Sequence, residues 1–538
     1  MKKLFIYTSI CLAVLTAFTA CNKKMNYGSD PYGGQVEPLG IKFADKLPSP
    51  SQARPGEAVT YRVEGASKFP NMEFFVNNVK VTVSTVTDST VTVQLPSVIS
   101  TGSAKIVVDG QTFAGPLTPI LGKVSIDPTF NPGTGANGMI NKIIRLKNNQ
   151  IFIGGNFTDY NGNKSLADIN GLARINSTGE FVTGMSFGKG AQEGSAAGYV
   201  SGIEELSDGK LLIYGTFNSY DSNANVKNIT VLNSTGSLYK ESVSILNLTE
   251  DPENSTMLVP AFNGGANKSI NKVFVRNSKV TAIGNFTQFT NNYYERSTYN
   301  SILRDYFEFN NIFRMNMNGS LDSTFLVNHN SFPKRGGFGV NGYVNDGYMD
   351  ANGKIILACA FTRFNNAVNA NNILRLNADG SFDNSFNIGA GPDKDIAKVI
   401  PYTNGRYFLI GKFDRYNGQE ANRMVLINAD GTVDPSFKAL KFTNGSPNYL
   451  AVLENGKILV SGTFTNYNQV IREGLMILNP DGTLAANYNN TGRLVGNVYD
   501  SYQGTNSLGQ KTITLVGYIS SFNGKLNLGN IVRLIIQD

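Results

Sequence analysis

The sequence contains no tryptophan, a single histidine (His329) and three cysteines among its 538 residues. One histidine and so few cysteines exclude the paired ligands of a zinc site, and no Asp-x-Asp loop of the calcium-binding type occurs. Charged residues are only 16% of the chain and hydrophobic residues 41%, which is typical of a folded protein. The composition therefore predicts a folded chain without a metal ion or other cofactor.

The chain also lacks any run of five or more basic residues, although its formal net charge is +7. A nucleic-acid-binding surface would concentrate Lys and Arg in one stretch, so we expect no nucleic-acid partner. Abundant Gly (56) with modest Pro (19) favours many short strands that are joined by tight turns.

Residues 1–20 differ from the rest of the chain. Two lysines precede an apolar run from Leu4 to Phe18, which predicts a signal peptide. Cys21 directly follows the small residues that end this segment, and the pattern resembles the lipobox of bacterial lipoproteins. In that family the cysteine is acylated and becomes the new N-terminus, so the resemblance implies that Cys21 carries a lipid and anchors the protein to a membrane. A plain signal peptide with a chance cysteine is the alternative.

Residues 21–37 are polar and glycine-rich, and we expect them to form a tether behind the lipid. With Cys11 inside the signal peptide and Cys21 lipidated, Cys359 would be the only free cysteine of the mature protein. This arrangement excludes a disulfide framework.

Residues 38–120 show the period-two alternation of short strands, as in MEFFVNNVKVTVSTV from Met72. Gly, Pro and Asn-Asn breaks separate four to seven such strands, which predicts a small β-sandwich. Pro55-Gly56 before a Val-Thr strand and Gly102 before the last strand resemble the IPT/TIG family. The resemblance implies an immunoglobulin-like sandwich.

From residue 121 onward one pattern recurs. IFIGGNFTDYNG begins at Ile151, and six related copies begin at Leu211, Val280, Ile355, Tyr407, Ile458 and Ile513. Asn-Gly and Asp-Gly pairs follow the strands at fixed places, because two-residue hairpins need positive φ. Two hairpins per repeat predict a four-stranded blade. We therefore expect an all-β chain, with the Ig-like sandwich followed by a seven-bladed β-propeller over residues 121–538.

The last repeat ends one strand early. KVSIDPTF, from Lys123 to Phe130, matches the ends of other repeats such as SLDSTF and TVDPSF. We predict that Lys123–Phe130 completes the last blade by strand exchange, which closes the ring and hides its sheet edges.

Two features of the repeat are interpreted as structural. Its fifth position is Gly in six copies and Cys359 in the other, which indicates a close approach of another backbone or side chain. Its seventh position is Phe or Ile and its tenth is Tyr or Phe. Rings at a fixed place in every blade favour packing between neighbouring sheets over ligand binding.

The clearest repeat tail is ILRLNADGSFDNSF, residues 373–386, and it resembles the delta-sixty repeat family of propellers. Together with the N-terminal features, the chain resembles a Bacteroidota type of outer-membrane lipoprotein with an immunoglobulin-like domain before this propeller. Such proteins are often associated with nutrient uptake. The resemblance implies a lipid-anchored protein of the outer membrane, on the cell surface or its periplasmic side, with an outer-membrane transporter as a partner. It supplies no catalytic residue.

Three long insertions, 243–271, 291–311 and 326–342, interrupt the repeats, and propeller geometry places all three on one face. Two of them carry aromatic and cationic side chains that suit stacking on, and hydrogen bonding to, a glycan or peptide. The candidate ligand-binding residues are Tyr293, Tyr294, Arg296, Tyr299, Arg304, Tyr306, Phe307, His329 and Arg335. The alternative is that these rings pack the loops onto the disk.

These observations predict a non-enzymatic binding protein of the cell envelope, which captures a glycan or peptide or serves as an accessory subunit of an importer. An adhesion or structural protein that binds another protein is an alternative. A glycan hydrolase or lyase is the second alternative, and it would need two carboxylates in the central channel. Glu204, Glu205, Asp346 and Asp500 lie on expected inner strands, although charged residues also line channels without chemistry.

Overall fold

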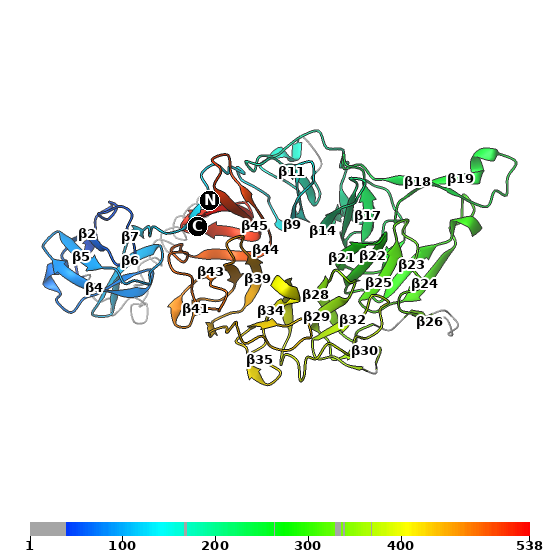
Figure 1. The fold of residues 1–538 in the computed structure, drawn as a ribbon. Helices are drawn as coiled ribbons and strands as arrows, with labels where there is room; N and C mark the ends of the chain where they lie inside the picture. The colour runs from blue at the N-terminus through cyan, green and yellow to red at the C-terminus, as the bar shows by residue number, and fades with distance from the viewer. Residues whose placement is uncertain (1–38, 166–168, 263, 329–334, 337–338, 367) are drawn as a thin grey trace, which may run out of the picture.

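The structure is a computed structural model that describes residues 39–165, 169–262, 264–328, 335–336, 339–366 and 368–538. Strands and turns make up almost all of this part, with short 3-10 turns between them, so the predicted all-β class is confirmed. No helix in the described ranges has the length and apolar character that crossing a membrane requires. Figure 1 shows a small N-terminal domain beside a much larger body of repeated sheets.

The N-terminal domain consists of seven strands in one hydrogen-bonded path, in the order β1-β2-β5-β4-β3-β6-β7. Strand β1 also contacts β7, so the sheet folds over and encloses a core around Tyr61 and Phe74. The strands are β1 (Lys42–Phe43), β2 (Ala58–Glu64), β3 (Glu73–Val76), β4 (Val79–Val86), β5 (Thr90–Gln94), β6 (Gly102–Val108) and β7 (Gln111–Thr118).

The larger body contains, in the described residues, seven antiparallel sheets that repeat one order of inner, middle and third strand. We number them one to seven along the chain. Their strands are β9 (Met139–Arg145), β10 (Ile151–Asn156) and β11 (Leu172–Ile175); β14 (Tyr199–Glu205), β15 (Leu211–Thr216) and β17 (Ile229–Leu232); β21 (Ile270–Arg276), β22 (Lys279–Gly284) and β25 (Ile312–Asn316); β28 (Tyr343–Met349), β29 (Ile355–Ala360) and β32 (Ile373–Leu376); β33 (Ile396–Pro401), β34 (Tyr407–Gly411) and β37 (Met424–Ile427); β39 (Pro447–Val452), β40 (Ile458–Gly462) and β43 (Leu475–Leu478); β44 (Leu494–Thr505), β45 (Lys511–Phe522) and β47 (Ile531–Ile536).

The sheets form a closed ring. Each inner strand contacts the inner strand of the next sheet, and β44 of the seventh sheet contacts β9 of the first. Strand β8 (Val124–Ile126) pairs antiparallel with β47, where Ile126 lies opposite Leu534. The predicted strand exchange within Lys123–Phe130 is therefore present, and it joins the two ends of the propeller.

The prediction of a full fourth strand in every blade was wrong. In sheets one to six the outer segment makes one isolated bridge to the third strand, such as Leu376 to Phe382. In the third, fourth and fifth sheets, an aspartate directly after the bridge starts a tight turn. In the fourth sheet, Asp383 Oδ1 accepts the backbone N–H of Ser385 at 3.0 Å.

The repeated aromatic positions form the cores between sheets, as predicted. All fourteen side chains at the seventh and tenth positions are buried, with exposed fractions of 3% or less. Where the tenth residue is tyrosine, its hydroxyl finds a backbone acceptor; Tyr160 and Tyr467 each donate to a hairpin glycine carbonyl at 2.7 Å. These rings belong to the fold and leave no aromatic face for a ligand.

The repeated glycine faces a β-bulge in the inner strand of its sheet. The register of the first sheet shifts between Gly154 and Gly155, and the other six sheets shift at the equivalent place. A Cβ on Gly155 would lie 2.1 Å from the carbonyl oxygen of Met139, and one on Gly517 only 1.9 Å from that of Asn497. The close approach predicted from the sequence is thus made by the backbone of the bulge.

Candidate functional site

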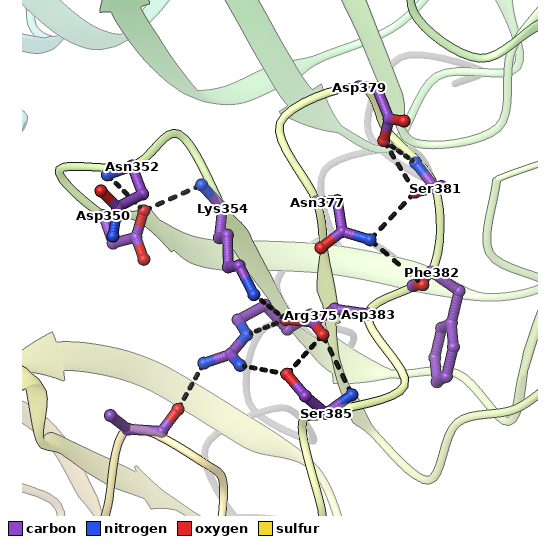
Figure 2. A network of polar contacts seen from close by, with 11 residues as sticks. Asp350, Asn352, Lys354, Arg375, Asn377, Asp379, Ser381, Phe382, Asp383 and Ser385 are labelled. Atoms are coloured by element: carbon purple, nitrogen blue, oxygen red, sulfur yellow. Dashed lines mark hydrogen bonds and ion pairs between the residues drawn. The ribbon is translucent and has the colours of Figure 1, made fainter.

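The recurrent tail of the repeat builds a polar network between neighbouring sheets (Figure 2). In the fourth sheet, Arg375 Nε donates to Asp383 Oδ2 at 2.6 Å, and Lys354 Nζ donates to the same oxygen at 2.8 Å. Arg375 Nη1 also donates to the carbonyl oxygen of Ala429 in the fifth sheet. The guanidinium lies 4.7 Å from the centre of the Phe386 ring. This arrangement, which we call the arginine staple, therefore ties one sheet to the next.

The same staple occurs in two further sheets. Arg314 Nε lies 2.7 Å from Asp322 Oδ2 in the third sheet. In the seventh, Arg533 Nε lies 2.7 Å from Asp127 Oδ2, which belongs to the strand-exchanged segment. The tail is visible in the sequence, but no role was predicted for its Arg and Asp residues. The sequence signal that could have revealed this pairing is the repeated spacing of eight residues between Arg and Asp across the hairpin, as in Arg314 and Asp322.

The staple controls the charge of its carboxylates. Burial alone would raise the pKa of Asp383, but hydrogen bonds from Lys354, Ser385 and Arg375 outweigh it and hold the pKa well below its usual range. The pKa of Asp322 is lowered in the same way, with Thr324 and Arg314 as its partners.

These lowered pKa values predict acid lability. A carboxyl whose pKa is lower in the folded state adds stability above its unfolded pKa of about 4, and this stability is lost as the pH falls toward the folded value. We therefore expect the free energy of unfolding in urea to be constant near neutrality and to decrease steadily below about pH 4. Equal stability at pH 7 and at pH 3 would contradict this assignment.

The four carboxylates considered for a hydrolase, Glu204, Glu205, Asp346 and Asp500, lie on the inner strands β14, β28 and β44. Three of them already bind the neighbouring sheet: Asp346 accepts the Val399 N–H at 2.8 Å, Asp500 the Ile143 N–H at 3.0 Å and Glu205 the Lys147 N–H at 3.0 Å. Asp346 and Asp500 are also paired with lysines. These contacts give the carboxylates a role in joining sheets.

Glu204 is the remaining carboxylate. Burial raises its pKa, while the nearby Lys142 and a hydrogen bond from Tyr214 oppose the shift. Tyr214 Oη lies 3.3 Å from Glu204 Oε1. The charge of Asp500 also raises the pKa of Glu204, and Asp500 itself accepts the Ile143 N–H and pairs with Lys142.

The long insertions do come together, as predicted. The first contains β18 (Lys240–Ser244), η4 (Pro252–Ser255) and β19 (Thr256–Pro260), and the second runs through β23 (Gln288–Asn292), η5 (Tyr294–Arg296) and β24 (Arg304–Glu308). Leu246 N donates to the carbonyl oxygen of Ser297 at 2.7 Å, which joins the two insertions. We call residues 240–260 and 288–308 the extension, because these hairpins project from the disk (Figure 1).

Most of the predicted aromatic residues lie on the surface of the extension. Tyr299 and Tyr306 are 59% and 51% exposed, and Tyr293 is 37% exposed. Tyr294 is half-buried, and its hydroxyl accepts a hydrogen bond from Asn292 Nδ2 at 3.3 Å. The tyrosines therefore do not simply pack the loops onto the disk.

Of the three predicted arginines, Arg296 is exposed and Arg304 donates to Asn225 Oδ1 at 3.0 Å. Arg335 lies in the two-residue strand β27 (Arg335–Gly336), which pairs with β26 (Val327–Asn328) and contacts β24. His329 and the predicted lipid-bearing Cys21 lie outside the described residues.

The prediction for Phe307 was wrong. Its side chain is 5% exposed and belongs to the core of the third sheet, together with Phe309 and Phe313. Side chains alternate along β24, so Phe307 points into the core while Tyr306 points to solvent. This alternation was not predicted, because no strand was expected within the insertion 291–311.

Exposed leucines complete the surface, and sequence analysis did not single them out. Leu246, Leu248, Leu258 and Leu303 are 48%, 74%, 65% and 49% exposed. Together with three tyrosines, the extension carries seven of the seventeen large hydrophobic side chains that are exposed in the described chain. The extension therefore exposes a larger share of such side chains than its length alone would give.

The sequence matches two family models. Residues 17–116 match a domain of unknown function (DUF5008). Four segments, 206–238, 351–386, 403–437 and 453–484, match a domain of unknown function described as a beta-propeller (DUF5122). The second match agrees with the propeller fold, and its segments coincide with repeats of the larger body. Among curated proteins, no relative matches this sequence.

Several solved structures are similar to this chain at low sequence identity. They include the computationally designed Ika8 protein, with 10% identity, a TM-score of 0.37 and coverage of 76% of this chain and 98% of that chain. A Bacteroides thetaiotaomicron protein provisionally described as a phosphatase has 10% identity and a TM-score of 0.31, with 92% and 97% covered. An auxiliary nutrient binding protein from Bacteroides ovatus has 9% identity and a TM-score of 0.28, with 93% and 98% covered. Such TM-scores are no guide to function.

Proposed function

We propose that the protein is a non-enzymatic binding protein of the cell envelope, and that its extension docks a partner protein. The observation that carries this proposal is the concentration of exposed leucines and tyrosines on the projecting hairpins. Leucine side chains offer no polar edge to a sugar, whereas apolar side chains with nearby Tyr and Arg are typical of protein interfaces. Arg296 and Arg304 supply the cations.

The N-terminal sequence supports the rest of the proposal, which concerns where the protein is located. The lipobox-like pattern at Cys21 supports a lipid anchor in the outer membrane, with the small domain and the tether between lipid and propeller. In this setting the partner would be an outer-membrane transporter, and the chain would serve as its accessory subunit for glycan or peptide uptake.

The proposal predicts that charge on the extension abolishes complex formation. Leu248→Asp with Leu258→Asp places two carboxylates at exposed apolar positions, where they should disrupt docking and leave the fold intact. We expect the wild-type lipidated protein to recover a transporter from its native membrane and the double variant to recover at least tenfold less, a loss of about 1.4 kcal/mol or more. Mass spectrometry of the pulled-down proteins measures this.

The control is Leu508→Asp, which adds a carboxylate at a leucine that is 69% exposed in the seventh sheet, outside the extension. Equal recovery by wild type and the double variant would rule out the docking role. Binding of a polysaccharide that is lost on Tyr299→Ala or Tyr306→Ala would instead assign the extension to glycan capture.

A further inference from the structure

A cavity lies between the first and seventh sheets, where the two ends of the propeller meet. Its volume is about 470 Å³, and its lining includes Arg145, Arg174 and Arg533. None of its described lining residues is Asp or Glu. We call this space the seam cavity. It lies beside the hairpin turns of these sheets and is formed by residues outside the extension.

The first sheet has the arginine of the staple but not its carboxylate. Val182 N donates to the carbonyl oxygen of Arg174 at 2.9 Å, as Asp383 N does to that of Arg375 in the fourth sheet. Val182 therefore occupies the position of the staple aspartate. Its apolar side chain cannot accept a hydrogen bond, and it also lines the seam cavity.

Arg174 is consequently left incompletely paired. Its Nη2 donates to the carbonyl oxygen of Thr183 at 2.9 Å, but its Nε is buried and has no hydrogen-bond partner among the described residues. In the other staples, the equivalent Nε reaches a carboxylate oxygen at 2.6 or 2.7 Å. A buried N–H group without an acceptor is costly, and a ligand that supplies an acceptor recovers that cost.

The remaining walls indicate the kind of ligand. Arg533 is already satisfied by Asp127, so the net positive charge of the cavity comes from Arg174 and the exposed Arg145. Ile143 and Val182 offer apolar surface, and Thr514 offers a hydroxyl. The volume, the positive charge and the partly apolar lining of the seam cavity suit a small molecule that has an anionic group and a partly apolar body.

We propose that the seam cavity binds a small organic carboxylate. Its carboxylate group would take the place of the missing staple aspartate and accept the Arg174 Nε–H, with Arg145 as the second cation. The ligand would thereby complete the one arginine staple that the sequence leaves open, at the junction that closes the ring. This site is independent of the proposed docking surface.

Calorimetry of the full-length protein with sodium benzoate, at constant ionic strength, tests the proposal. We expect saturable binding of one benzoate, and Arg174→Met should weaken it about tenfold or more, because a charge-assisted hydrogen bond is lost. Absence of saturable heat from the wild-type protein at millimolar benzoate would overturn the proposal. Equal binding of inorganic phosphate would overturn the assignment to carboxylates.

Val182→Asp provides a second test that does not depend on removing the arginine. It installs the carboxylate of the other staples, so it should both abolish benzoate binding and raise the melting temperature. Val182→Thr is the matched control, since it keeps the shape without adding charge and should retain binding. Undiminished benzoate binding by Val182→Asp would show that Arg174 does not hold the carboxylate.

Discussion

Gly411→Ala should destabilise the propeller, although strand propensity alone predicts the opposite. In a regular strand, alanine is favoured over glycine by about 0.5–1 kcal/mol. At this position the new Cβ would lie 2.3 Å from the carbonyl oxygen of Asp395 and 2.9 Å from the Cα of Ile396. Both atoms belong to the backbone of the bulge, so no flexible side chain can move aside. Overpacking of this kind costs about 3 kcal/mol, which outweighs the propensity gain.

The matched control is Cys359→Ala. Cys359 takes the place of the repeated glycine in the fourth sheet, where the structure already accommodates a Cβ opposite Val344. Alanine there removes only the sulfur atom, so we expect a much smaller loss. Urea unfolding followed by tyrosine fluorescence compares the two variants with the wild-type protein. If Gly411→Ala is as stable as the wild type, the bulge does not require glycine.

The bulge also explains why a structural role could be predicted for the repeated pattern from the sequence alone. Glycine at the fifth position and rings at the seventh and tenth serve each sheet in the same way, so one local argument applied to every copy. The match between Lys123–Phe130 and later repeat tails predicted ring closure, because a strand missing at one end was present at the other.

Long-range contacts were beyond this kind of reasoning. Arg533 and Asp127 are 406 residues apart, and only the closed ring brings them to 2.7 Å. The same limit applies to the extension. The sequence shows that its loop is rich in aromatic residues. The burial of Phe307, however, depends on the pairing of β24 with β23. The exposure of Leu248 depends on a hairpin that projects from the disk, and no periodicity in the sequence indicates such a projection.

Asp383→Asn should lower the free energy of unfolding as much as Gly411→Ala does. The cause here is electrostatic, whereas in Gly411→Ala it is a steric clash. The Asp383 side chain is 5% exposed, and one of its oxygens accepts from both Arg375 and Lys354. Asparagine removes the charge and leaves the buried guanidinium without a counterion. Breaking a buried ion pair from one side costs about 3 kcal/mol. We expect this decrease in the free energy of urea unfolding at pH 7.

Two comparisons isolate the cause. Asp414 is 50% exposed and pairs with Lys394 and Arg423, so Asp414→Asn should change stability little because water screens such pairs. Arg375→Met combined with Asp383→Asn removes both charges, so it should cost less than the sum of the single variants. Additive losses would mean that the two side chains act separately, and that the staple does not join the sheets through their pairing. A loss of stability smaller than that sum would show that the Arg375–Asp383 pair itself stabilises the protein. Arg174 in the first sheet lacks a pair of this kind.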